Sequence, residues 1–339
     1  MTGTLIYRTN LFFPRFSGFY PHFKGSPVAP FLTNCYNDVR RLLTDITRND
    51  IMLNTIILIL SSSYYEKIKP YTDTLRQTLL LHGVSLQITA LEKSSLLSDR
   101  QQSFDSCSQT LIVTDTPKAF DLLSAAGLYV IALYHENNQG CSFSHALYAV
   151  EDLLHLEYHS FLEAYCRLAQ IPLDILETDR LLVRESTLDD IPDFYRIYED
   201  PSTIRYLDPL FPTLEEERAY LQDYIRHVYG FYGFGIWSVI LKETGTLIGR
   251  AGLNIREGYE IPELGFVLES AYRNRGLTYE VCRAILTYAK EELCFDRLQA
   301  LVKEENTASK NLLFKLGFSF FETVTEQGTE YQLYTIELK

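Results

Sequence analysis

Short apolar runs alternate with amphipathic helical stretches through the first half of the chain, and this alternation limits the possible folds more than any other feature. Runs of strand length, rich in Ile, Leu and Val, are separated by stretches whose apolar residues recur every three or four positions. Strands that alternate with helices predict a parallel, doubly wound sheet. The expected strands are Thr55–Leu60, Ser85–Thr89, Thr110–Thr114 and Tyr129–Leu133, and the expected helices are Asn37–Thr47, Tyr65–Leu81, Lys118–Ala126 and Leu156–Ala169.

A proline near the middle of the chain marks the expected boundary between two domains. The 339 residues suffice for two hydrophobic cores, and Pro172 ends the last helix of the first half. We therefore expect an N-terminal domain over residues 1–172 and a C-terminal domain over residues 173–339, with irregular chain at 1–33 and 92–108. The second half is expected to hold strands at 175–184, 235–241, 246–253, 263–269, 297–302 and 331–338, and helices at 186–199, 278–293 and 308–316.

Charge and cysteine content narrow the class of partner and the compartment. The net charge is −13, and residues 173–339 carry −11 of it. This acidic field argues against nucleic acid and favours cationic partners such as amines, unless it serves solubility alone. The six cysteines are scattered without metal-binding spacing, so we expect reduced thiols, no metal and a cytoplasmic monomer or homodimer. No apolar run reaches the length of a membrane span, and we expect no membrane partner.

The most informative stretch of the second half is the turn Arg273–Thr278, which lies between an apolar strand and an amphipathic helix. A glycine flanked by arginines at a helix start directs backbone N–H groups outward at the positive end of the helix dipole. Each charge-assisted bond from such a site to a phosphate contributes roughly 1.5–3 kcal/mol. The turn therefore predicts a pyrophosphate site, the alternative being a helix start that serves stability alone.

Four segments of the second half together resemble the GNAT superfamily of N-acetyltransferases, and in particular its ribosomal-protein-alanine acetyltransferase-like branch. Residues 178–184 (TDRLLVR) resemble the first strand of that family, and residues 246–252 (TLIGRAG) resemble its third. Residues 263–278 are similar to its acetyl-CoA motif, and residues 306–318 are similar to its last helix and turn. The resemblance covers Leu176 to Lys339 and implies an α+β domain with a mixed sheet.

The resemblance also implies roles for particular residues. In this family the phosphates of acetyl-CoA lie on the turn after the fourth strand. The implied cofactor-binding residues are Val267, Leu268, Arg273, Asn274, Arg275, Gly276, Leu277, Thr278, Asn306 and Ser309. Glu263 is the candidate catalytic base, because related enzymes use a strand carboxylate there, directly or through water. A structural residue held in a salt bridge is the alternative for Glu263.

Some positions depart from the family pattern or have a plainer interpretation. Thr278 stands where Gly or Ala is usual, and it would either cap the helix or crowd the cofactor. Leu313 replaces the tyrosine that often serves as general acid, and Tyr279 is a distant substitute. Asn306 with Ser309 also fits an ordinary helix N-terminus. Trp237, the only tryptophan, is expected in the core rather than at the acceptor.

The N-terminal half weakly resembles the haloacid dehalogenase-like phosphohydrolases, which have a Rossmann-like fold. Asp115 matches the acidic position that helps to hold Mg²⁺ in that family, and residues 61–63 match the hydroxyl that binds phosphate. The nucleophilic Asp-x-Asp-Gly-Thr run is absent, so the resemblance implies a degenerate and non-hydrolytic module. His135, His155 and His159 lack partners at metal spacing, and we expect surface or capping roles for them.

Together these observations predict an acetyl-CoA-dependent N-acetyltransferase that acts on a primary amine, either a small molecule or a protein N-terminus, by direct attack on the thioester. At pH 7, deprotonation costs roughly 4–5 kcal/mol for a lysine-type amine and about 1 kcal/mol for an α-amino group. A base is therefore more important for the lysine-type acceptor. The alternatives are a CoA-binding regulatory protein without turnover and a phosphohydrolase activity in the N-terminal domain.

Overall fold

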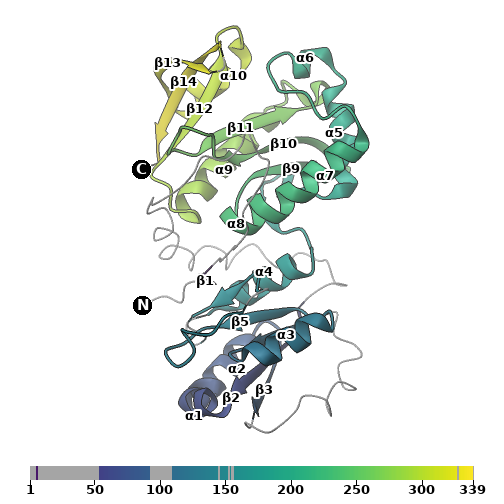
Figure 1. The fold of residues 1–339 in the computed structure, drawn as a ribbon. Helices are drawn as coiled ribbons and strands as arrows, with labels where there is room; N and C mark the ends of the chain where they lie inside the picture. Colours follow the sequence, from purple (N-terminus) through teal and green to yellow (C-terminus); the bar gives the residue numbers. More distant parts are fainter. Residues whose placement is uncertain are drawn as a thin grey trace. The chain divides into compact units, whose positions relative to one another are not determined.

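The computed structural model describes residues 5–6, 53–91, 109–143, 146–151, 153, 156–326 and 328–338. The expected helix Asn37–Thr47 lies outside these residues, as does nearly all of the chain expected to be irregular. The described residues up to Ile171 form one compact unit, and those from Pro172 onward form a second (Figure 1). Within the described chain, no helix is long and apolar enough to cross a membrane.

The N-terminal unit is built on a six-stranded sheet with the order β1-β6-β5-β4-β2-β3 (Figure 1). Apart from β1, which is antiparallel to β6, all neighbouring strands are parallel, as the alternation of strands and helices predicts. From β2 the chain moves outward to β3 and then returns to β4, so the strand order reverses between β2 and β4. In such open sheets, ligands bind outside the carboxyl ends of the strands at this reversal. The strands are β1 Leu5–Ile6, β2 Thr55–Ser61, β3 Ser85–Leu91, β4 Thr110–Thr114, β5 Val130–Leu133 and β6 Ala149–Val150.

The helices of this unit differ from the prediction at one proline. The stretch expected to be a single helix is two helices, because Pro70 lies in a short 3-10 turn between them and cannot donate a backbone hydrogen bond. Strand β6 was not predicted, since two residues carry no readable periodicity. The helices are α1 Ser62–Ile68, α2 Thr72–Leu80, α3 Pro117–Ala125 and α4 Tyr158–Leu168.

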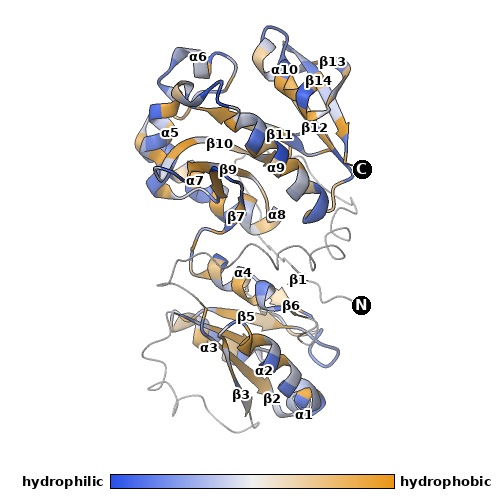
Figure 2. Cartoon of the chain, turned by 180° about the vertical axis from the view of Figure 1, so that it is seen from behind, coloured by the Kyte–Doolittle hydropathy of each residue, from blue (hydrophilic) through white to orange (hydrophobic). Residues whose placement is uncertain are grey.

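The C-terminal unit contains a mixed eight-stranded sheet with the order β13-β14-β12-β11-β10-β9-β8-β7. Its strands are β7 Asp174–Glu177, β8 Leu181–Arg184, β9 Ile236–Leu241, β10 Thr246–Asn254, β11 Glu263–Leu268, β12 Arg297–Lys303, β13 Ser319–Glu326 and β14 Thr329–Glu337. Its helices include α5 Ile191–Tyr198, α6 Pro201–Ile204, α7 Leu214–Tyr224, α8 Gly230–Tyr232, α9 Leu277–Glu291 and α10 Thr307–Leu316. Hydrophobic residues concentrate on the central strands, whereas the helices also carry hydrophilic residues (Figure 2).

Two strand predictions need correction in this unit. The single strand expected at 175–184 is an antiparallel hairpin of β7 and β8, because the chain turns at Thr178, whose N–H donates to Leu181 O. Strand β13 was not predicted, because most of its residues are exposed and no buried stripe marks it. The short helix α6 and the helix α7 were also missed.

The two faces of the sheet are covered by different helices. Trp237 of β9 is fully buried and packs edge-to-face on Tyr288 of α9, with ring centroids 5.7 Å apart, which confirms the expected core role. The next residue, Ser238, points to the opposite face and donates to Asp190, which directly precedes α5. Helix α9 therefore covers one face, and α5 covers the other.

Strands β11 and β12 are held together at one end only. β11 pairs with β10 along its whole length, from Glu263 to Leu268. With its parallel neighbour β12 it shares a single residue pair, Glu263 with Gln299. Beyond that pair the two strands separate, so the β12-facing backbone edge of β11 is left without a partner strand.

Candidate functional site

The turn predicted to bind pyrophosphate follows β11 directly and opens the longest helix of the unit. Asn274 and Gly276 both adopt left-handed backbone conformations, with φ of 61° and 75°. Gly276 is the N-cap of α9, and no side chain caps the helix. The first-turn N–H groups at Leu277 and Thr278 are thus directed outward without a side-chain acceptor. Thr278 lies inside the first turn, so the structure excludes helix capping, one of the two alternatives for this residue.

Glycine at position 276 is required by backbone conformation rather than by lack of space. A Cβ atom there would meet only the Arg180 guanidinium, at an ordinary contact distance of 3.6 Å. The φ of 75° requires glycine, because residues with a side chain are strained in this region of backbone conformation.

The arginines of the turn have different roles. Arg273 is committed to protein contacts: it donates to Ser202 Oγ at 2.8 Å, Thr203 Oγ1 at 2.5 Å and the Leu268 carbonyl at 3.3 Å. It therefore fastens α6 to the turn. Arg275 is exposed, and its guanidinium lies 5.4 Å from the centre of the Tyr272 ring. Of the two, Arg275 is the cation available to an anion.

A third arginine, missed by the sequence analysis, lies against the same turn. Arg180 donates to the Arg275 carbonyl at 3.0 Å and forms an ion pair with Glu280 at 2.5 Å. Glu280 also accepts from Thr178 Oγ1 at 2.6 Å. Partial burial raises the Glu280 pKa, but hydrogen bonds from Thr178 and Arg180 outweigh it, and the pKa is lowered overall. Arg180 lies 95 positions before Arg275 in the sequence. It is found only because the β7–β8 hairpin lies close to α9 in the fold.

The candidate base Glu263 is buried and paired. Its carboxylate accepts from Arg256 Nε at 2.6 Å, and Arg256 also donates to Glu326 at 2.7 Å. A weaker bond from Leu301 N–H reaches Glu263 Oε1 at 3.4 Å, where β12 leaves β11. Glu263 therefore lies in a salt bridge at the point where the two strands separate.

Two tyrosines extend this charged cluster. The Tyr259 hydroxyl lies beside Glu326, and burial together with that carboxylate raises the Tyr259 pKa to about 12. The Arg256 guanidinium is 6.0 Å from the centre of the Tyr331 ring. The charge of Glu263 is thus embedded in a network of Arg256, Glu326 and phenolic groups that stay protonated at neutral pH.

The later helix positions have structural roles in this state. Asn306 Oδ1 accepts from Ser309 N–H at 3.2 Å, which makes Asn306 the N-cap of α10. Leu313, where the family often has tyrosine, is fully buried in the core. Among the strand candidates, Leu268 is buried and Val267 is half-buried.

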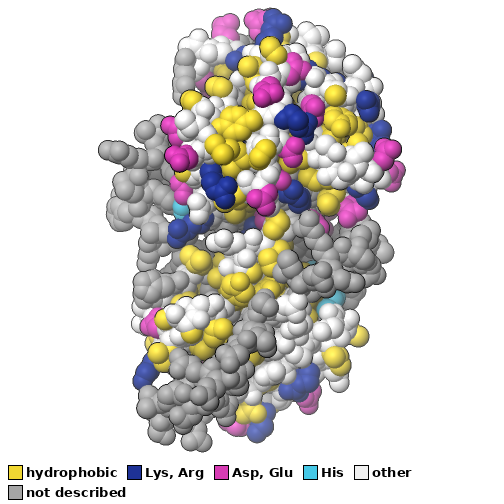
Figure 3. Space-filling model, turned by 90° about the vertical axis from the view of Figure 1, so that its right-hand side faces the viewer, with side chains coloured by type: hydrophobic (Ala, Val, Ile, Leu, Met, Phe, Trp, Pro, Cys, Tyr) yellow, Lys and Arg dark blue, Asp and Glu magenta, His cyan; other side chains and the backbone are white. Residues whose placement is uncertain are grey.

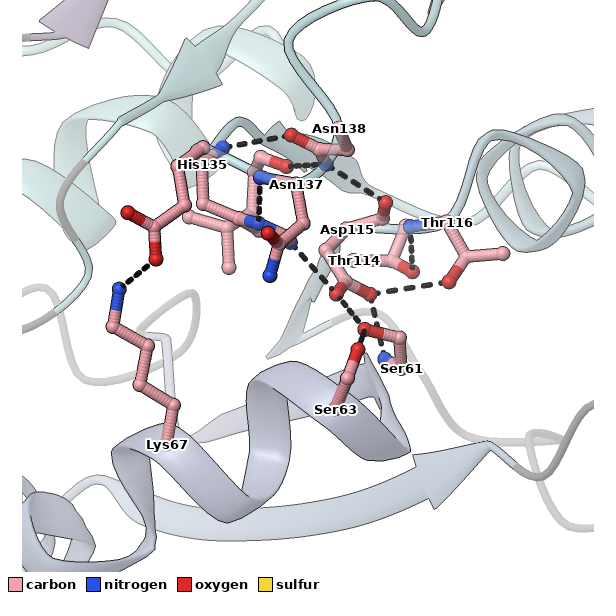
Figure 4. A network of polar contacts seen from close by, with 11 residues as sticks. Ser61, Ser63, Lys67, Thr114, Asp115, Thr116, His135, Asn137 and Asn138 are labelled. Atoms are coloured by element: carbon pink, nitrogen blue, oxygen red, sulfur yellow. Dashed lines mark hydrogen bonds and ion pairs between the residues drawn. The ribbon is translucent and has the colours of Figure 1, made fainter.

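A polar cluster in the N-terminal unit lies at the reversal of strand order (Figure 4). Asp115, directly after β4, accepts from the backbone N–H of Ser61 at 2.7 Å and from its hydroxyl at 2.5 Å. Thr116 Oγ1 donates to the same carboxylate at 3.1 Å, and His135 Nε2 lies 3.0 Å from it. The sequence resemblance thus selected two residues, Ser61 and Asp115, that lie together in the fold.

Of the surface and capping roles expected for His135, the structure excludes the surface role. Its side chain is only 7% exposed, stacks on Tyr64 at 4.2 Å between ring centroids and contacts Asp115. Its Nδ1 accepts from the Asn137 N–H at 3.2 Å, so Nε2 carries the proton that points to Asp115. The Asp115 carboxylate is therefore fully engaged with protein donors. His159 lies near aromatic rings, and His155 falls outside the described residues.

Comparison with known proteins shows a family match within the C-terminal unit. Residues 180–319 match the family model of the acetyltransferase (GNAT) domain. Two proteins of Bacillus subtilis strain 168 described as uncharacterized N-acetyltransferases, YnaD and YoaA, are each 27% identical, over 159 and 163 residues; each alignment covers 46% of this chain, and 91% and 92% of the respective relative. Among solved structures, a GNAT-family acetyltransferase from Bacillus anthracis is 23% identical with a TM-score of 0.42, over 49% of this chain and 99% of its own.

Proposed function

We propose that this chain, an N-acetyltransferase whose residues 180–319 match the acetyltransferase (GNAT) domain, transfers the acetyl group of acetyl-CoA to a primary amine. The observation that carries the proposal is the uncapped N-terminus of α9 at Gly276, which follows the strand that separates from β12. The N-terminus of α9 offers N–H donors for phosphates, and β11 offers a free strand edge.

The turn supplies three kinds of attraction for a pyrophosphate. Backbone N–H groups at Leu277 and Thr278 are directed outward, and the dipole of the 15-residue helix adds positive potential there. Arg275 contributes a charge that no protein carboxylate neutralises among the described residues. Arg180 contributes a second charge, which Glu280 partly neutralises. Arg273 acts by holding the shape of the turn.

The free edge of β11 suits the amide-bearing arm of CoA. Residues 264–268 present backbone N–H and C=O groups toward the gap left by β12. Unpaired strand-edge groups take an added strand through main-chain hydrogen bonds. An arm bound there would place its thioester toward Glu263, at the closed end of the gap.

The reaction is a direct transfer. The neutral amine nitrogen attacks the thioester carbonyl carbon, a C–N bond forms, and a tetrahedral oxyanion results. Its collapse breaks the C–S bond and releases CoA as a thiolate, while the amine nitrogen gives up one proton. An α-amino acceptor needs little help to lose its proton beforehand, at about 1 kcal/mol near pH 7.

Glu263 is proposed as the acceptor of that proton through water. Its position at the closed end of the gap supports the role, and the hydrogen bond from Arg256 fixes the orientation of its carboxylate there. An α-amino acceptor requires less of this base than a lysine side chain does, because the lysine costs roughly 4–5 kcal/mol to deprotonate at pH 7.

A second candidate is a protein that holds CoA without turnover. Glu263 is engaged by Arg256, and Leu313 is buried where the family often has tyrosine, which together favour this alternative. For the N-terminal unit we propose a degenerate haloacid dehalogenase-like module over residues 1–172 that does not hydrolyse phosphate esters. The engagement of Asp115 by four protein donors supports this proposal, because no lone pair is left for Mg²⁺ without rearrangement.

Calorimetric titration with acetyl-CoA and a thiol-release assay with a panel of amines test both candidates. Saturable binding with thiol release supports the transferase; binding without release from any amine supports the holding role. Absence of binding at millimolar acetyl-CoA would refute both. The variant Gly276→Glu is expected to lose binding, and Gly245→Glu is its control, because Gly245 has a similar φ of 68° in the β9–β10 turn.

A further inference from the structure

One arginine in the centre of the C-terminal sheet has no charged partner within the described part of the chain. Arg250 lies in β10, between β9 and β11, and is 9% exposed. Among the described residues its guanidinium makes no hydrogen bond and no ion pair, and its Nε atom is buried without a partner. A buried charge without a partner costs several kcal/mol, so proteins rarely retain one without a use for it.

Aromatic side chains surround this charge but do not neutralise it. The guanidinium lies 4.4 Å from the centre of the Phe194 ring, and Tyr198, Tyr220, Tyr224 and Tyr229 are its electrostatic neighbours. Burial raises the pKa of the Tyr229 hydroxyl to about 12 and that of Tyr224 well above its usual value, so these groups are neutral. Cation–π contacts offset only part of the cost of removing the charge from water.

Two of these tyrosines are already hydrogen-bonded, and two are not. Tyr224 Oη accepts from the Ile236 N–H at 2.7 Å, and Tyr229 donates to the Ile236 carbonyl at 2.6 Å. The hydroxyls of Tyr198 and Tyr220 have no partner within the part of the chain that the structure describes. Both residues interact electrostatically with Arg250, and their hydroxyls are two uncommitted donors in its surroundings.

A neighbouring arginine shows what a structural cation looks like in this sheet. Register pairing places Arg184, Ser238, Arg250 and Val267 in one row across β8 to β11, all on the same face. Arg184 forms two bonds of 2.7 Å with Asp190, which Ser238 also contacts. The nearby buried Glu217 accepts instead from the Phe211 N–H at 3.0 Å. Arg250 therefore lacks the carboxylate that its neighbour has.

The row leads directly to the strand proposed to hold the cofactor. Arg250 is opposite Val267 of β11, and such pairs have Cβ atoms about 4.5–5.5 Å apart. On this face lie α5 and α7; in Figure 3, acidic and basic side chains are scattered between hydrophobic ones there. The charges at the surface are thus of both signs, and the buried carboxylates Asp190 and Glu217 beneath it are bonded to Arg184 and to the Phe211 N–H rather than to Arg250.

We propose that the acetyl acceptor carries a carboxylate and that Arg250, with the Tyr198 and Tyr220 hydroxyls, binds it. The inference rests on the proposed function and specifies its substrate class as an amine that also bears an acid group. A planar guanidinium matches the two oxygens of one carboxylate. A phosphate monoester carries about −1.5 to −2 charge at pH 7, more than this single cation neutralises.

Stability measurements test the unpaired state of Arg250 without any knowledge of the acceptor. Arg250→Met removes the charge and keeps the bulk, and the denaturant midpoint is expected to stay equal to that of the wild type or to rise. Arg184→Met is the matched control, and its midpoint is expected to fall, because Asp190 is left buried without its partner. A fall as large in Arg250→Met, or loss of its folded state, would show a structural cation and refute the proposal.

Kinetics with matched acceptors test the carboxylate itself. Free amino acids are compared with their amides, and peptides with Asp or Glu near the N-terminus are compared with Asn or Gln peptides, which separates small from peptide acceptors. The wild type is expected to favour the acid member of a productive pair by about 10- to 100-fold in kcat/KM, and Arg250→Gln is expected to abolish the preference. Equal use of acid and amide, or a preference that survives in Arg250→Gln, would contradict it. Acetyl-CoA titration of the same proteins reports separately on the proposed function.

Discussion

Reversal of the charge at Arg275 is the sharpest test of the phosphate site. Among the residues that the structure describes, the guanidinium of Arg275 contacts only the Tyr272 ring, so its replacement leaves no buried group there unpaired. A charge-assisted bond to a phosphate contributes about 1.5–3 kcal/mol, which corresponds to roughly 10- to 150-fold in affinity. Arg275→Ala should lower acetyl-CoA affinity by this factor, and Arg275→Glu should lower it further because it repels the pyrophosphate.

Calorimetric titration at several ionic strengths provides the measurement. The screening length shrinks from about 10 Å at 0.1 M salt to about 3 Å at 1 M, so the difference between wild type and Arg275→Glu should narrow as salt increases. Arg283→Glu makes the same charge change on an exposed face of the same helix and should alter affinity little. Thermal unfolding without ligand should be the same for all three proteins.

A substitution of Arg273 is expected to behave differently from one of Arg275. It is tied to Ser202 and Thr203, so Arg273→Gln should lower stability as well as affinity. The reasoning is refuted if Arg283→Glu weakens binding as much as Arg275→Glu does, or if Arg275→Glu binds acetyl-CoA like the wild type.

Three further predictions follow from burial and charge. Cys282 is fully buried and its pKa is raised by burial, whereas Cys141 is exposed, so a thiol reagent should label Cys141 in the native protein and Cys282 only after unfolding; rapid native labelling of Cys282 would contradict this. The pKa of Glu280 is lowered in the folded protein, so its ionised side chain stabilises the fold above its unfolded pKa, and this stabilisation is lost as the pH falls through the folded pKa. In Glu280→Gln, the part of the fall in denaturation midpoint at acid pH that is due to Glu280 should be absent. Leu313→Ala should cost about 2–5 kcal/mol of unfolding free energy, measured by denaturant titration, because Leu313 is fully buried; a cost near zero would remove Leu313 from the core.

Local patterns predicted most strands and helices, and long-range contacts account for what was missed. The buried strands β2, β4 and β5 are continuous apolar runs, and the start of α9 was placed within one residue by its glycine turn. The short β6 and the mostly exposed β13 have no such pattern, since neighbouring strands rather than their own periodicity stabilise them.

In the candidate site, too, some residues can be predicted from local sequence and others cannot. Gly276 and its flanking arginines can be read from adjacent positions, but the different roles of Arg273 and Arg275 depend on where α6 lies. Arg180 reaches the turn only because the β7–β8 hairpin packs beside α9, and residues so far apart leave no local signal. The isolation of Arg250 is also invisible in sequence, because it depends on the bonding of the nearby carboxylates: Asp190 pairs with Arg184, and Glu217 accepts from the Phe211 N–H.

The single residue pair between β11 and β12 makes the sheet two sections joined at one point. β7 to β11 form one section and β12 to β14 form the other, and Glu263 with Gln299 connects them. A cofactor arm bound along β11 would act as the missing strand between the sections. Ligand binding stabilises a fold by RT ln(1 + [L]/Kd), about 2.7 kcal/mol at a hundredfold excess over Kd. The rigidity of the domain would then depend on the concentration of acetyl-CoA around it, and amide exchange in β12 and β14 would slow as that concentration rises.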